Sequence, residues 1–371
     1  MRRERILFII HALYSGGAQR VIVNLLNNID REKFDIHLIV LKAEGIMLSD
    51  IKSDVTIHDL GNPSIKRVFV KFLKRIYSIK PDIVFSGIGH INGLLSPFIP
   101  ILSRLIPHKV RWIARETSIA SLYIQHDNNS GLYQFLYRNF YKNFNQIICQ
   151  SRYMRDDLSN SFNLSKDKMV VINNPVDIKK IERLSIEKIG SREKKFNANK
   201  INLIAVGALR EEKRFDLLLE AFAYLGDSYR LTIVGEGEKE AELKQLSLDL
   251  GISSQVSFEG QQSNPYNYMK SADVLVLSSA FEGFPNVLLE ANACGIPVIA
   301  FNAPGGIGEI VIEGFNGYLV TPNSVVELSS TILSFEKTSF DGEKIKEYIK
   351  EKYALNTIIK KYEEVLLRCT I

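Results

Sequence analysis

Cysteine is scarce in this chain of 371 residues, and the three that occur, Cys149, Cys294 and Cys369, are widely separated. Their odd number and scattered positions predict neither a disulfide framework nor a zinc site, and they fit a reducing cytoplasm. The chain also has no apolar run of about eighteen residues, so we expect no membrane-spanning helix. The first residues pass from Met-Arg-Arg-Glu-Arg directly into a short apolar strand, which is not the pattern of a cleaved signal peptide.

A large excess of one charge is missing as well. Lysine and arginine total 47 and aspartate and glutamate total 42, which gives a formal net charge of +5. This mild excess does not indicate a nucleic-acid-binding protein, but it suits anionic substrates or an anionic membrane surface. Hydrophobic residues make up 46% of the chain and charged residues 24%, values of a globular protein that is long enough for two domains.

Short apolar runs alternate with amphipathic stretches along the whole chain. In the first half we predict strands over residues 6–10, 36–41, 83–85, 110–114 and 146–149, and helices over 18–28, 66–78, 92–104 and 132–144. In the second half we predict strands over 201–206, 230–234, 256–259, 274–277, 297–300 and 317–320, and helices over 215–225, 239–250, 287–293 and 325–333. Nearly continuous apolar strands that are each followed by a helix indicate an α/β protein with two Rossmann-like, doubly wound parallel sheets.

A polar segment separates the two halves. Residues 177–200 are rich in lysine and glutamate and show no strand pattern, so we place the hinge near Asn174-Pro175-Val176-Asp177. The expected domains are therefore 1–176 and 177–350. Apolar residues recur at helical spacing over 345–367, which predicts a terminal helix.

The most specific feature of the sequence is Phe281-Glu282-Gly283-Phe284-Pro285-Asn286-Val287, which continues to Glu290. Glu282 is expected on a loop and Glu290 about one turn inside the following helix, with Asn286 as its N-cap. Backbone N–H groups at the start of a helix favour an anion such as a phosphate. Phosphate-binding amides between two hydroxyl-accepting carboxylates suit a nucleotide sugar, with its diphosphate in the middle, its ribose on one side and its hexose on the other.

This stretch resembles the E-x7-E signature of retaining GT-B glycosyltransferases, specifically glycosyltransferase family 4. The run from Val206 to Ala221 is similar to the family segment VGRLxxEKGxDLLLxA, in which Lys213 matches the phosphate-binding lysine. The family arginine after the glycine is Ala208 here, and we expect Arg210 to reach the same oxygens.

Further segments resemble other parts of the same family. Gly16-Gly17 lies in a passage similar to the GGAERV loop, with Gln19 in place of glutamate. Gly235-Glu236-Gly237 resembles the VGxG turn beside the nucleotide, and residues 256–261 resemble the V-x-F-x-G strand end near the base. Residues 303–311 resemble the segment that closes around the sugar, and residues 174–177 resemble PNGVD.

The resemblance is dense over residues 205–320 and collinear over 6–177. It implies a GT-B fold, with an acceptor-binding first domain, a nucleotide-sugar-binding second domain, an interdomain cleft, and a helix over 351–371 that crosses back onto the first domain. It implies a retaining hexosyltransferase that uses a nucleotide-diphosphate sugar, UDP rather than GDP, in front-face transfer to a lipid-linked or glycan acceptor of bacterial surface polysaccharide synthesis. The catalytic residues it implies are Lys213 and Glu282, and the donor-binding residues are Gly16, Gly17, Arg210, Gly235, Gly237, Phe284, Pro285, Asn286, Val287 and Glu290.

The first domain departs from the family pattern. Many members have a histidine after the strand that corresponds to 110–114, where this chain has Arg115-Glu116-Thr117-Ser118. The acceptor-side candidates are His90, Arg115 and Glu116, and the role of the missing histidine is not transferred to Glu116. Asp-x-Asp, the pair that holds a metal in GT-A enzymes, does not occur, so we expect neither a metal nor another cofactor.

A polyprenyl-diphosphate-linked or oligosaccharide acceptor is the partner that the resemblance implies. Residues 66–77 form a basic amphipathic pattern, with Val68, Phe72 and Ile76 on one face and Lys71 and Lys74 mostly on the other. Such a helix can lie on an anionic membrane surface, and the aromatic stretch 132–141 is a second candidate contact. The alternative is that both helices cover the first sheet with their apolar faces. We expect a cytoplasmic enzyme that is peripheral on the inner face of the cell membrane.

Two other functions remain open at this stage. A GT-B nucleotide-sugar 2-epimerase would act without an acceptor. A non-catalytic GT-B partner subunit would fit the departures at Ala208 and Glu116, although Lys213, Glu282 and Glu290 argue against it. An NAD-dependent dehydrogenase is disfavoured because G-x-G-x-x-G is absent from the expected turn.

Overall fold

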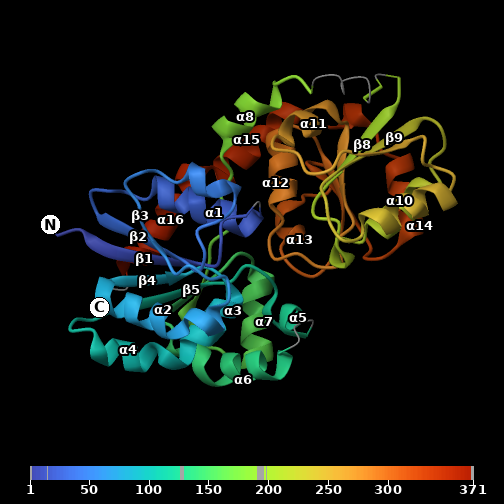
Figure 1. The fold of residues 1–371 in the computed structure, drawn as a ribbon. Helices are drawn as coiled ribbons and strands as arrows, with labels where there is room; N and C mark the ends of the chain where they lie inside the picture. The colour runs from blue at the N-terminus through green and yellow to red at the C-terminus, as the bar shows by residue number, and fades with distance from the viewer. Residues whose placement is uncertain (1, 15, 126–128, 190–195, 198, 369–371) are drawn as a thin grey trace. The chain divides into compact units, whose positions relative to one another are not determined.

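The computed structural model describes residues 2–14, 16–125, 129–189, 196–197 and 199–368, so that Cys369 lies outside the described residues. The chain divides into two compact units, one made of residues 1–175 and 355–371 and the other of residues 176–354 (Figure 1). The chain leaves the first unit after residue 175, one residue before the expected boundary, and it returns to the first unit after residue 354 instead of 350.

A parallel sheet forms the centre of the first unit. Its strand order is β3-β2-β1-β4-β5-β6-β7, and every neighbouring pair is parallel. The strands are β1 (Glu4–Ile10), β2 (Phe34–Val40), β3 (Thr56–Asp59), β4 (Ile83–Ser86), β5 (Arg111–Arg115), β6 (Gln146–Cys149) and β7 (Met169–Val171). The chain moves outward from β1 to β3 on one side and from β4 to β7 on the other, so the direction of winding switches between β1 and β4.

Helices cover both faces of this sheet. They are α1 (Gly17–Asn28), α2 (Ile65–Ile79), α3 (Gly89–Leu95), α4 (Ile99–Leu105), α5 (Ala120–Gln125), α6 (Ser130–Phe140), α7 (Arg152–Phe162) and α16 (Leu355–Arg368). The single helix expected over 92–104 is wrong, because a 3₁₀ turn over Ser96–Phe98 separates α3 from α4. Pro97 and Pro100 are the second residues of the turn and of α4, in the first turn of each, where proline is tolerated in helical structure.

The two faces of the first sheet carry different helices. On one face, Phe8 and Phe85 of the strands share a buried cluster with Leu25 of α1 and with Ile358 and Tyr362 of α16. Helix α1 leads from β1 toward β3, whereas α2, α4 and α6 lead to β4, β5 and β6 in the opposite direction along the sheet. Because such crossovers are right-handed, these three helices lie on the other face. Figure 1 shows α2, α4 and α6 together on that side of the first unit.

The apolar face of α2 is turned toward the sheet. Val68, Phe72 and Ile76 are all buried, so this face covers the sheet and is not presented to a membrane. For α2, the second of the two interpretations is therefore correct: its apolar face covers the first sheet. No helix in the described part of the chain is both long enough and apolar enough to cross a membrane.

The second unit repeats the same architecture with six parallel strands in the order β10-β9-β8-β11-β12-β13. The strands are β8 (Ile201–Val206), β9 (Tyr229–Val234), β10 (Val256–Phe258), β11 (Val274–Leu277), β12 (Val298–Phe301) and β13 (Gly317–Val320). The helices are α8 (Ile178–Ser185), α9 (Phe215–Phe222), α10 (Glu240–Asp249), α11 (Tyr266–Ser271), α12 (Asn286–Ala293), α13 (Ile307–Ile310), α14 (Val325–Leu333) and α15 (Gly342–Tyr353). The predicted α/β class with two doubly wound parallel sheets is confirmed.

The expected terminal helix is two helices that belong to different units. Ala354 separates α15 from α16, with φ −55° and ψ 144°. Its neighbour Tyr353 accepts a hydrogen bond of 2.8 Å from the backbone N–H of Val176, so the two passages between the units run side by side. The last helix, α16, packs into the first unit, and its Tyr362 hydroxyl accepts from Arg115 Nε at 3.0 Å.

Candidate active site

The candidate active site lies where the winding of the second sheet switches direction, between β8 and β11. At such a point the loops that leave the two strands go to opposite faces of the sheet, and doubly wound proteins bind their ligands there. Residues 207–214 follow β8 and residues 278–285 follow β11. The first loop carries Lys213 and the second carries Glu282.

Lys213 and Glu282 are in direct contact. Lys213 Nζ lies 2.5 Å from Glu282 Oε1, and Ser279 Oγ donates to the same oxygen at 2.8 Å. The two side chains retain 24% and 13% of their exposure, so a ligand can reach them from solvent. The structure therefore brings together the two residues that the sequence identifies as catalytic.

Two buried contacts tie the loops to each other. Ser278 Oγ donates to the carbonyl oxygen of Lys213 at 2.9 Å, and the N–H of Ala280 donates to the carbonyl oxygen of Glu212 at 2.8 Å. The sequence analysis did not identify Ser278 or Ser279. The available signal was a pair of hydroxyl residues immediately after a buried strand, but its meaning depends on which loop lies opposite.

The loop after β12 closes against Glu282. The N–H of Glu282 donates to the carbonyl oxygen of Pro304 at 3.0 Å, and the N–H of Gly306 donates to that of Glu282 at 3.3 Å. Between them Gly305 has φ +124°, and a Cβ atom there would lie 1.5 Å from the oxygen of Glu282. Only glycine fits this close backbone approach. Residues 303–306 thus support the carboxylate loop from the side of β12.

The glycines after β9 have a similar structural role. Gly235 has φ +147°, and a Cβ atom on it would lie 1.8 Å from the carbonyl oxygen of Gly207. A Cβ atom on Gly237 would lie 2.4 Å from that of Leu209. Both glycines therefore allow the turn after β9 to pack on the loop that carries Arg210 and Lys213. The side chain of Arg210 is exposed on this loop.

Helix α12 begins directly after the Glu282 loop. Asn286 is its first residue, so the expectation that Asn286 caps the helix is wrong, because Pro285 occupies the cap position. Phe284 is buried, and its ring centroid lies 5.9 Å from that of Tyr353, so its side chain packs in the protein interior. Val287 and Asn286 are half-buried at the start of the helix.

Glu290 lies in the second turn of α12 and is 9% exposed. Its backbone carbonyl accepts from the N–H of Cys294. Burial raises the pKa of the Cys294 thiol to about 12, and the negative charge of Glu290 acts in the same direction. The structure thus places Glu290 on the helix that follows Glu282, as the sequence predicts, with limited access from solvent.

The first unit has its own switch point, between β1 and β4. His11 follows β1 and His90 lies at the start of α3, and their ring centroids are 6.0 Å apart. Gly16 precedes α1 and Gly17 is its first residue. A Cβ atom on Gly16 would lie 2.4 Å from Gln19 Oε1, so the side chain of Gln19 approaches this glycine. The sequence analysis identified His90 but missed His11.

Arg115 is built into the interior of the first unit. It is 0% exposed, and its guanidinium donates to Tyr362 at 3.0 Å and to Asn174 Oδ1 at 2.8 Å. These bonds connect the end of β5 to α16 and to the last residues before the hinge. Because the side chain is enclosed by these partners, we do not propose an acceptor contact for it.

Glu116 is buried as well. Asn92 Nδ2 donates to Glu116 Oε1 at 3.1 Å, and the hydroxyls of Tyr137 and Tyr141 donate to the same carboxyl group. Burial is the largest influence on this group and raises its pKa to about 7. Its partners come from α3, α6 and the turn after α6, so Glu116 joins these elements.

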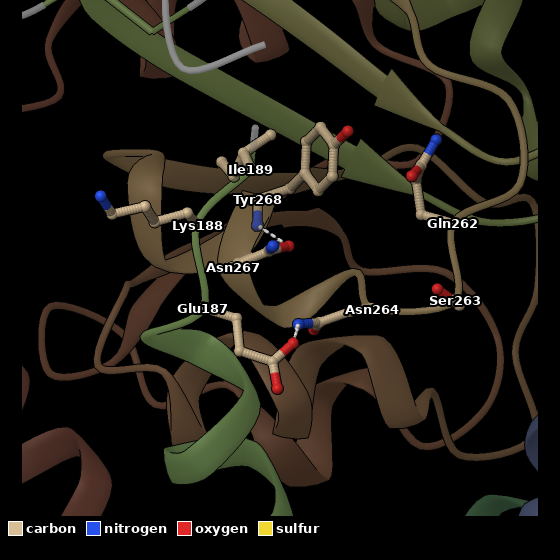
Figure 2. Close-up of a pocket in the computed structure, with 8 residues that line it drawn as sticks. All are labelled: Glu187, Lys188, Ile189, Gln262, Ser263, Asn264, Asn267 and Tyr268. Atoms are coloured by element: carbon tan, nitrogen blue, oxygen red, sulfur yellow. Dashed lines mark hydrogen bonds between the residues drawn. The ribbon is translucent and has the colours of Figure 1, made fainter. Parts of the chain in front are cut away.

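A hollow of about 270 Å³ lies elsewhere on the second unit (Figure 2). It is lined by Glu187, Lys188, Ile189, Gln262, Ser263, Asn264, Asn267 and Tyr268. Asn264 Nδ2 donates to Glu187 Oε2 at 3.0 Å across it. None of the site residues identified above lines this hollow. Within the residues that the structure describes, no group of three or more His, Cys, Asp or Glu side chains is arranged to hold a metal ion.

Two family models match the chain. Residues 15–180 match Glycosyltransferase Family 4, and residues 187–352 match Glycosyl transferases group 1. Over 355 residues, and 92% of each protein, the chain is 28% identical to the N-acetylgalactosamine-N,N'-diacetylbacillosaminyl-diphospho-undecaprenol 4-alpha-N-acetylgalactosaminyltransferase of Campylobacter jejuni. Over 168 residues, and 44% of each protein, it is 33% identical to the lipopolysaccharide 1,6-galactosyltransferase of Salmonella typhimurium.

Solved structures show the same fold. The crystal structure of HepE from Anabaena in complex with UDP-glucose superimposes with a TM-score of 0.80, at 21% identity over 98% of this chain and 99% of that one. The apo form of the lipopolysaccharide outer core galactosyltransferase WaaB gives 0.74 at 19% identity, again over 98% and 99%. The two sequence models, which succeed each other along most of the chain, and the similar transferases show that the protein is a glycosyltransferase of family 4, and the solved structures show that its fold is GT-B.

Proposed function

We propose that this glycosyltransferase moves a hexose-type sugar from a UDP-sugar to a lipid-linked acceptor, with retention of anomeric configuration, in the synthesis of a bacterial surface polysaccharide. The observation that carries the proposal is the contact of Lys213, Glu282 and Ser279 at the switch point of the second sheet. The undecaprenol-linked substrate named for the Campylobacter relative and the UDP-glucose bound by HepE support the choice of acceptor and nucleotide.

Lys213 has the role of neutralising the leaving diphosphate. Its partner Glu282 is partly exposed, and ion pairs of this kind contribute only about 0–1 kcal/mol. A diphosphate that carries more charge can therefore draw the ammonium group away from Glu282 at little cost. Negative charge grows on the diphosphate as the bond to the sugar breaks, so the lysine stabilises the transition state more than the bound donor.

Glu282 has the role of holding the donor sugar. Its Oε1 accepts from Ser279 and Lys213, which leaves Oε2 for a sugar hydroxyl. The N–H groups at the start of α12 carry partial positive charge and suit the phosphates between the two glutamates. Glu290, one turn further along α12, would accept from the hydroxyls of the ribose.

The transfer itself is proposed to occur on one face of the sugar and without a metal ion. The bond between the anomeric carbon and the diphosphate oxygen breaks, and the acceptor oxygen forms the new bond from the same side. The proton of the acceptor hydroxyl passes to the leaving phosphate oxygen. Lys213, the exposed Arg210 and the amides of α12 neutralise the charge, which fits the absence of Asp-x-Asp from the sequence.

A donor screen tests this function. Thermal shift and direct detection of the released nucleotide are measured with UDP- and GDP-sugars, alone and with polyprenyl-diphosphate-linked saccharides as acceptors. We expect UDP release that depends on the acceptor, an α-linked product by NMR, and loss of release in Lys213→Met. Release of free or epimerised sugar without an acceptor would indicate an epimerase or hydrolase instead, and the absence of donor binding would indicate a non-catalytic subunit.

A further inference from the structure

One residue beside Lys213 has an unusual backbone conformation. Lys213 ends a 3₁₀ turn over Glu211–Lys213, and Arg214 stands between this turn and α9. Arg214 has φ 49° and ψ 43°, in the left-handed region that residues with a side chain rarely adopt. Its N–H donates to the carbonyl oxygen of Glu211 at 3.1 Å, and its own carbonyl oxygen accepts from the N–H of Leu218 at 3.4 Å. Arg214 is therefore the single residue through which the turn passes into the helix.

This conformation requires support from the rest of the structure. Four described residues other than glycine have positive φ, namely Lys80, Asn163, Arg214 and Asn323. Lys80 and Asn163 follow α2 and α7 directly, where the left-handed conformation is common, and asparagine adopts it readily. Arg214 also follows a helical turn, but it is at the same time the N-cap of α9, a position where an extended backbone is the rule.

Two side chains hold the guanidinium group of Arg214. Its Nε lies 3.1 and 3.2 Å from the two carboxylate oxygens of Asp216, and its Nη2 donates to Asp216 Oδ2 at 3.0 Å. Its Nη1 donates to Asn323 Oδ1 at 3.1 Å. Asp216 lies in the first turn of α9, where a carboxylate is favoured, and Asn323 lies in the turn between β13 and α14. The guanidinium thus joins the start of α9 to the loop after β13 through charge-assisted bonds.

Lys213 is held from a different side. Its carbonyl oxygen accepts from Ser278 Oγ at 2.9 Å and its Nζ binds Glu282, so its backbone and its side chain both face the loop after β11. The side chain of Arg214 reaches the loop after β13 instead. The left-handed residue provides the change of chain direction that lets the two neighbouring side chains reach these separate loops. A return of residue 214 to negative φ would turn Lys213 relative to α9 and away from Glu282.

We propose that Arg214 is a positioning residue for the transfer reaction. Its contacts with Asp216 and Asn323 hold residue 214 in the left-handed conformation, and this conformation directs Lys213 toward Glu282 and the leaving diphosphate. Arg214 acts through the backbone and does not contact the donor. The inference rests on the proposed function in one respect, since the direction of Lys213 matters because this lysine neutralises the diphosphate.

Alanine and glycine at position 214 separate this role from a contribution to stability alone. Arg214→Ala removes the guanidinium but keeps a Cβ atom, so the backbone leaves the strained conformation. Arg214→Gly removes the same contacts, but glycine adopts positive φ without strain. We expect Arg214→Ala to lower kcat by about tenfold to a hundredfold, because small displacements of a catalytic group have effects of this size, and to change the dissociation constant of the UDP-sugar by less than about threefold. Arg214→Gly should recover most of the lost kcat. If Arg214 only stabilised the fold, the more flexible glycine would give no such recovery.

Asn323→Gly tests the same contacts from their other end. The change removes the acceptor of Arg214 Nη1, and glycine suits the φ of 62° at this position. It should lower kcat when residue 214 is arginine and leave kcat unchanged when residue 214 is glycine. Because Asn323→Gly introduces no backbone strain, it gives the test in a folded protein even if Arg214→Ala does not fold.

Lys80→Ala and Lys80→Gly are the matched controls. Lys80 is exposed at the end of α2 in the first unit and has φ 50°, so the same two changes are made at a similar backbone conformation away from the second sheet. Thermal unfolding of these controls should respond to the change of backbone freedom, whereas kcat should stay at the wild-type value. Steady-state kinetics, calorimetric donor binding and thermal unfolding are measured for every variant.

Equal losses of kcat in Arg214→Ala and Arg214→Gly, or wild-type kcat in both, overturn the positioning role. Crystal structures of the two variants give a readout that needs no substrate. The contact between Lys213 and Glu282 should be broken in Arg214→Ala and kept in Arg214→Gly, and a contact that is kept in both overturns the role as well. If wild type transfers no sugar but the contact responds in the expected way, the positioning role stands and the proposed function is contradicted instead.

Discussion

Lys213 Nζ binds Glu282 Oε1 at 2.5 Å, so the side chains proposed to hold the diphosphate and the sugar of the donor contact each other directly. The contact joins loops that leave β8 and β11, which are adjacent in the sheet although β9 and β10 lie between them in the sequence. A donor that binds both residues must exchange this ion pair for two contacts of its own. The two residues should therefore be coupled in binding and in catalysis.

Lys213→Met should lower kcat by about 100- to 1000-fold, while donor affinity changes less, because the lysine acts mainly on charge that develops in the transition state. Glu282→Gln should weaken donor binding more than it lowers kcat. Their double mutant should be less impaired than the product of the two single effects, since each residue loses its partner in either variant. Steady-state kinetics and calorimetric donor binding measure the cycle.

The matched control is Lys244→Met, which breaks a lysine–glutamate pair of 2.6 Å to Glu240 on α10 of the same unit. Its kinetic constants should stay at wild-type values. If Lys213→Met lowers kcat and donor affinity equally, the lysine binds the donor and the transition state alike. If the double mutant loses activity by the product of the two single effects, Lys213 and Glu282 are not coupled.

Glu290→Gln should raise the dissociation constant for the UDP-sugar by about tenfold to a hundredfold. The change replaces a carboxylate with an amide of the same shape, so it removes a charge-assisted bond of about 1.5–3 kcal/mol to a ribose hydroxyl without opening a cavity. Donor titration by calorimetry gives the affinity, and thermal unfolding verifies the fold. Glu347→Gln, at an exposed position on α15, is the control. Unchanged affinity in folded Glu290→Gln would remove Glu290 from the donor site.

Gly305→Ala should lower both stability and activity. Its Cβ would lie 1.5 Å from the carbonyl oxygen of Glu282, and its φ of +124° disfavours any side chain, so the loop after β12 must move and release the Glu282 loop. Gly314→Ala is the comparison, because Gly314 has φ +70° and open space around it. We expect about 1 kcal/mol for Gly314→Ala and a larger loss for Gly305→Ala, with donor binding impaired only in the latter. Similar effects of the two changes on binding would refute a supporting role for Gly305.

The sequence predicts the architecture well where strands are long or fully buried. The bounds of β8 and β11 agree with the predicted ones at both ends. Two strands at sheet edges, β3 and β7, were missed. β3 is largely exposed and has no continuous apolar run, and the apolar run of β7 is only three residues long. The division between α15 and α16 was missed because it comes without glycine or proline and depends on backbone pairing with Val176.

The site was predictable only where a local motif exists. Lys213, Glu282 and Glu290 belong to such motifs, whereas Ser279 and His11 gain meaning only from the strand order, which places another loop beside them. Burial of Arg115 and Glu116 was equally invisible, since their partners come from positions as distant as Asn92, Tyr137 and Tyr362. Long-range contacts of this kind leave no periodic signal around the residue itself.

Transfer should continue in excess EDTA. The proposed site neutralises the diphosphate with Lys213, Arg210 and the amides of α12, so removal of divalent ions should leave kcat within about twofold of its original value. Direct chromatographic detection of UDP is needed, because coupling enzymes can themselves require magnesium. If EDTA abolishes transfer and Mn²⁺ or Mg²⁺ restores it, a metal-assisted mechanism replaces the one proposed here.

The buried carboxyl group of Glu116 should make the first unit less stable as the pH rises from about 4.5 to about 7. Burial raises its pKa from 4.5 to about 7, so in this range the folded protein holds a proton that the unfolded chain releases. Because the folded protein binds more protons in this range, the contribution of Glu116 to the free energy of unfolding is complete below the pKa of the unfolded chain. It falls as the pH rises toward the pKa of the folded protein. The loss is of the order of 3 kcal/mol, since each pKa unit corresponds to about 1.4 kcal/mol.

Glu116→Gln removes this titration while its amide can still accept from Asn92 and the two tyrosines. Denaturant unfolding of wild type and variant at pH 5 and pH 8 isolates the effect, because every other group contributes equally to both proteins. We expect the free energy of unfolding of Glu116→Gln, relative to wild type, to increase by a few kcal/mol between the two pH values. Glu32→Gln, at an exposed position of the same unit, should leave the wild-type pH dependence in place. Parallel pH curves for Glu116→Gln and wild type would mean that the carboxyl group is already ionised in the folded protein at pH 5.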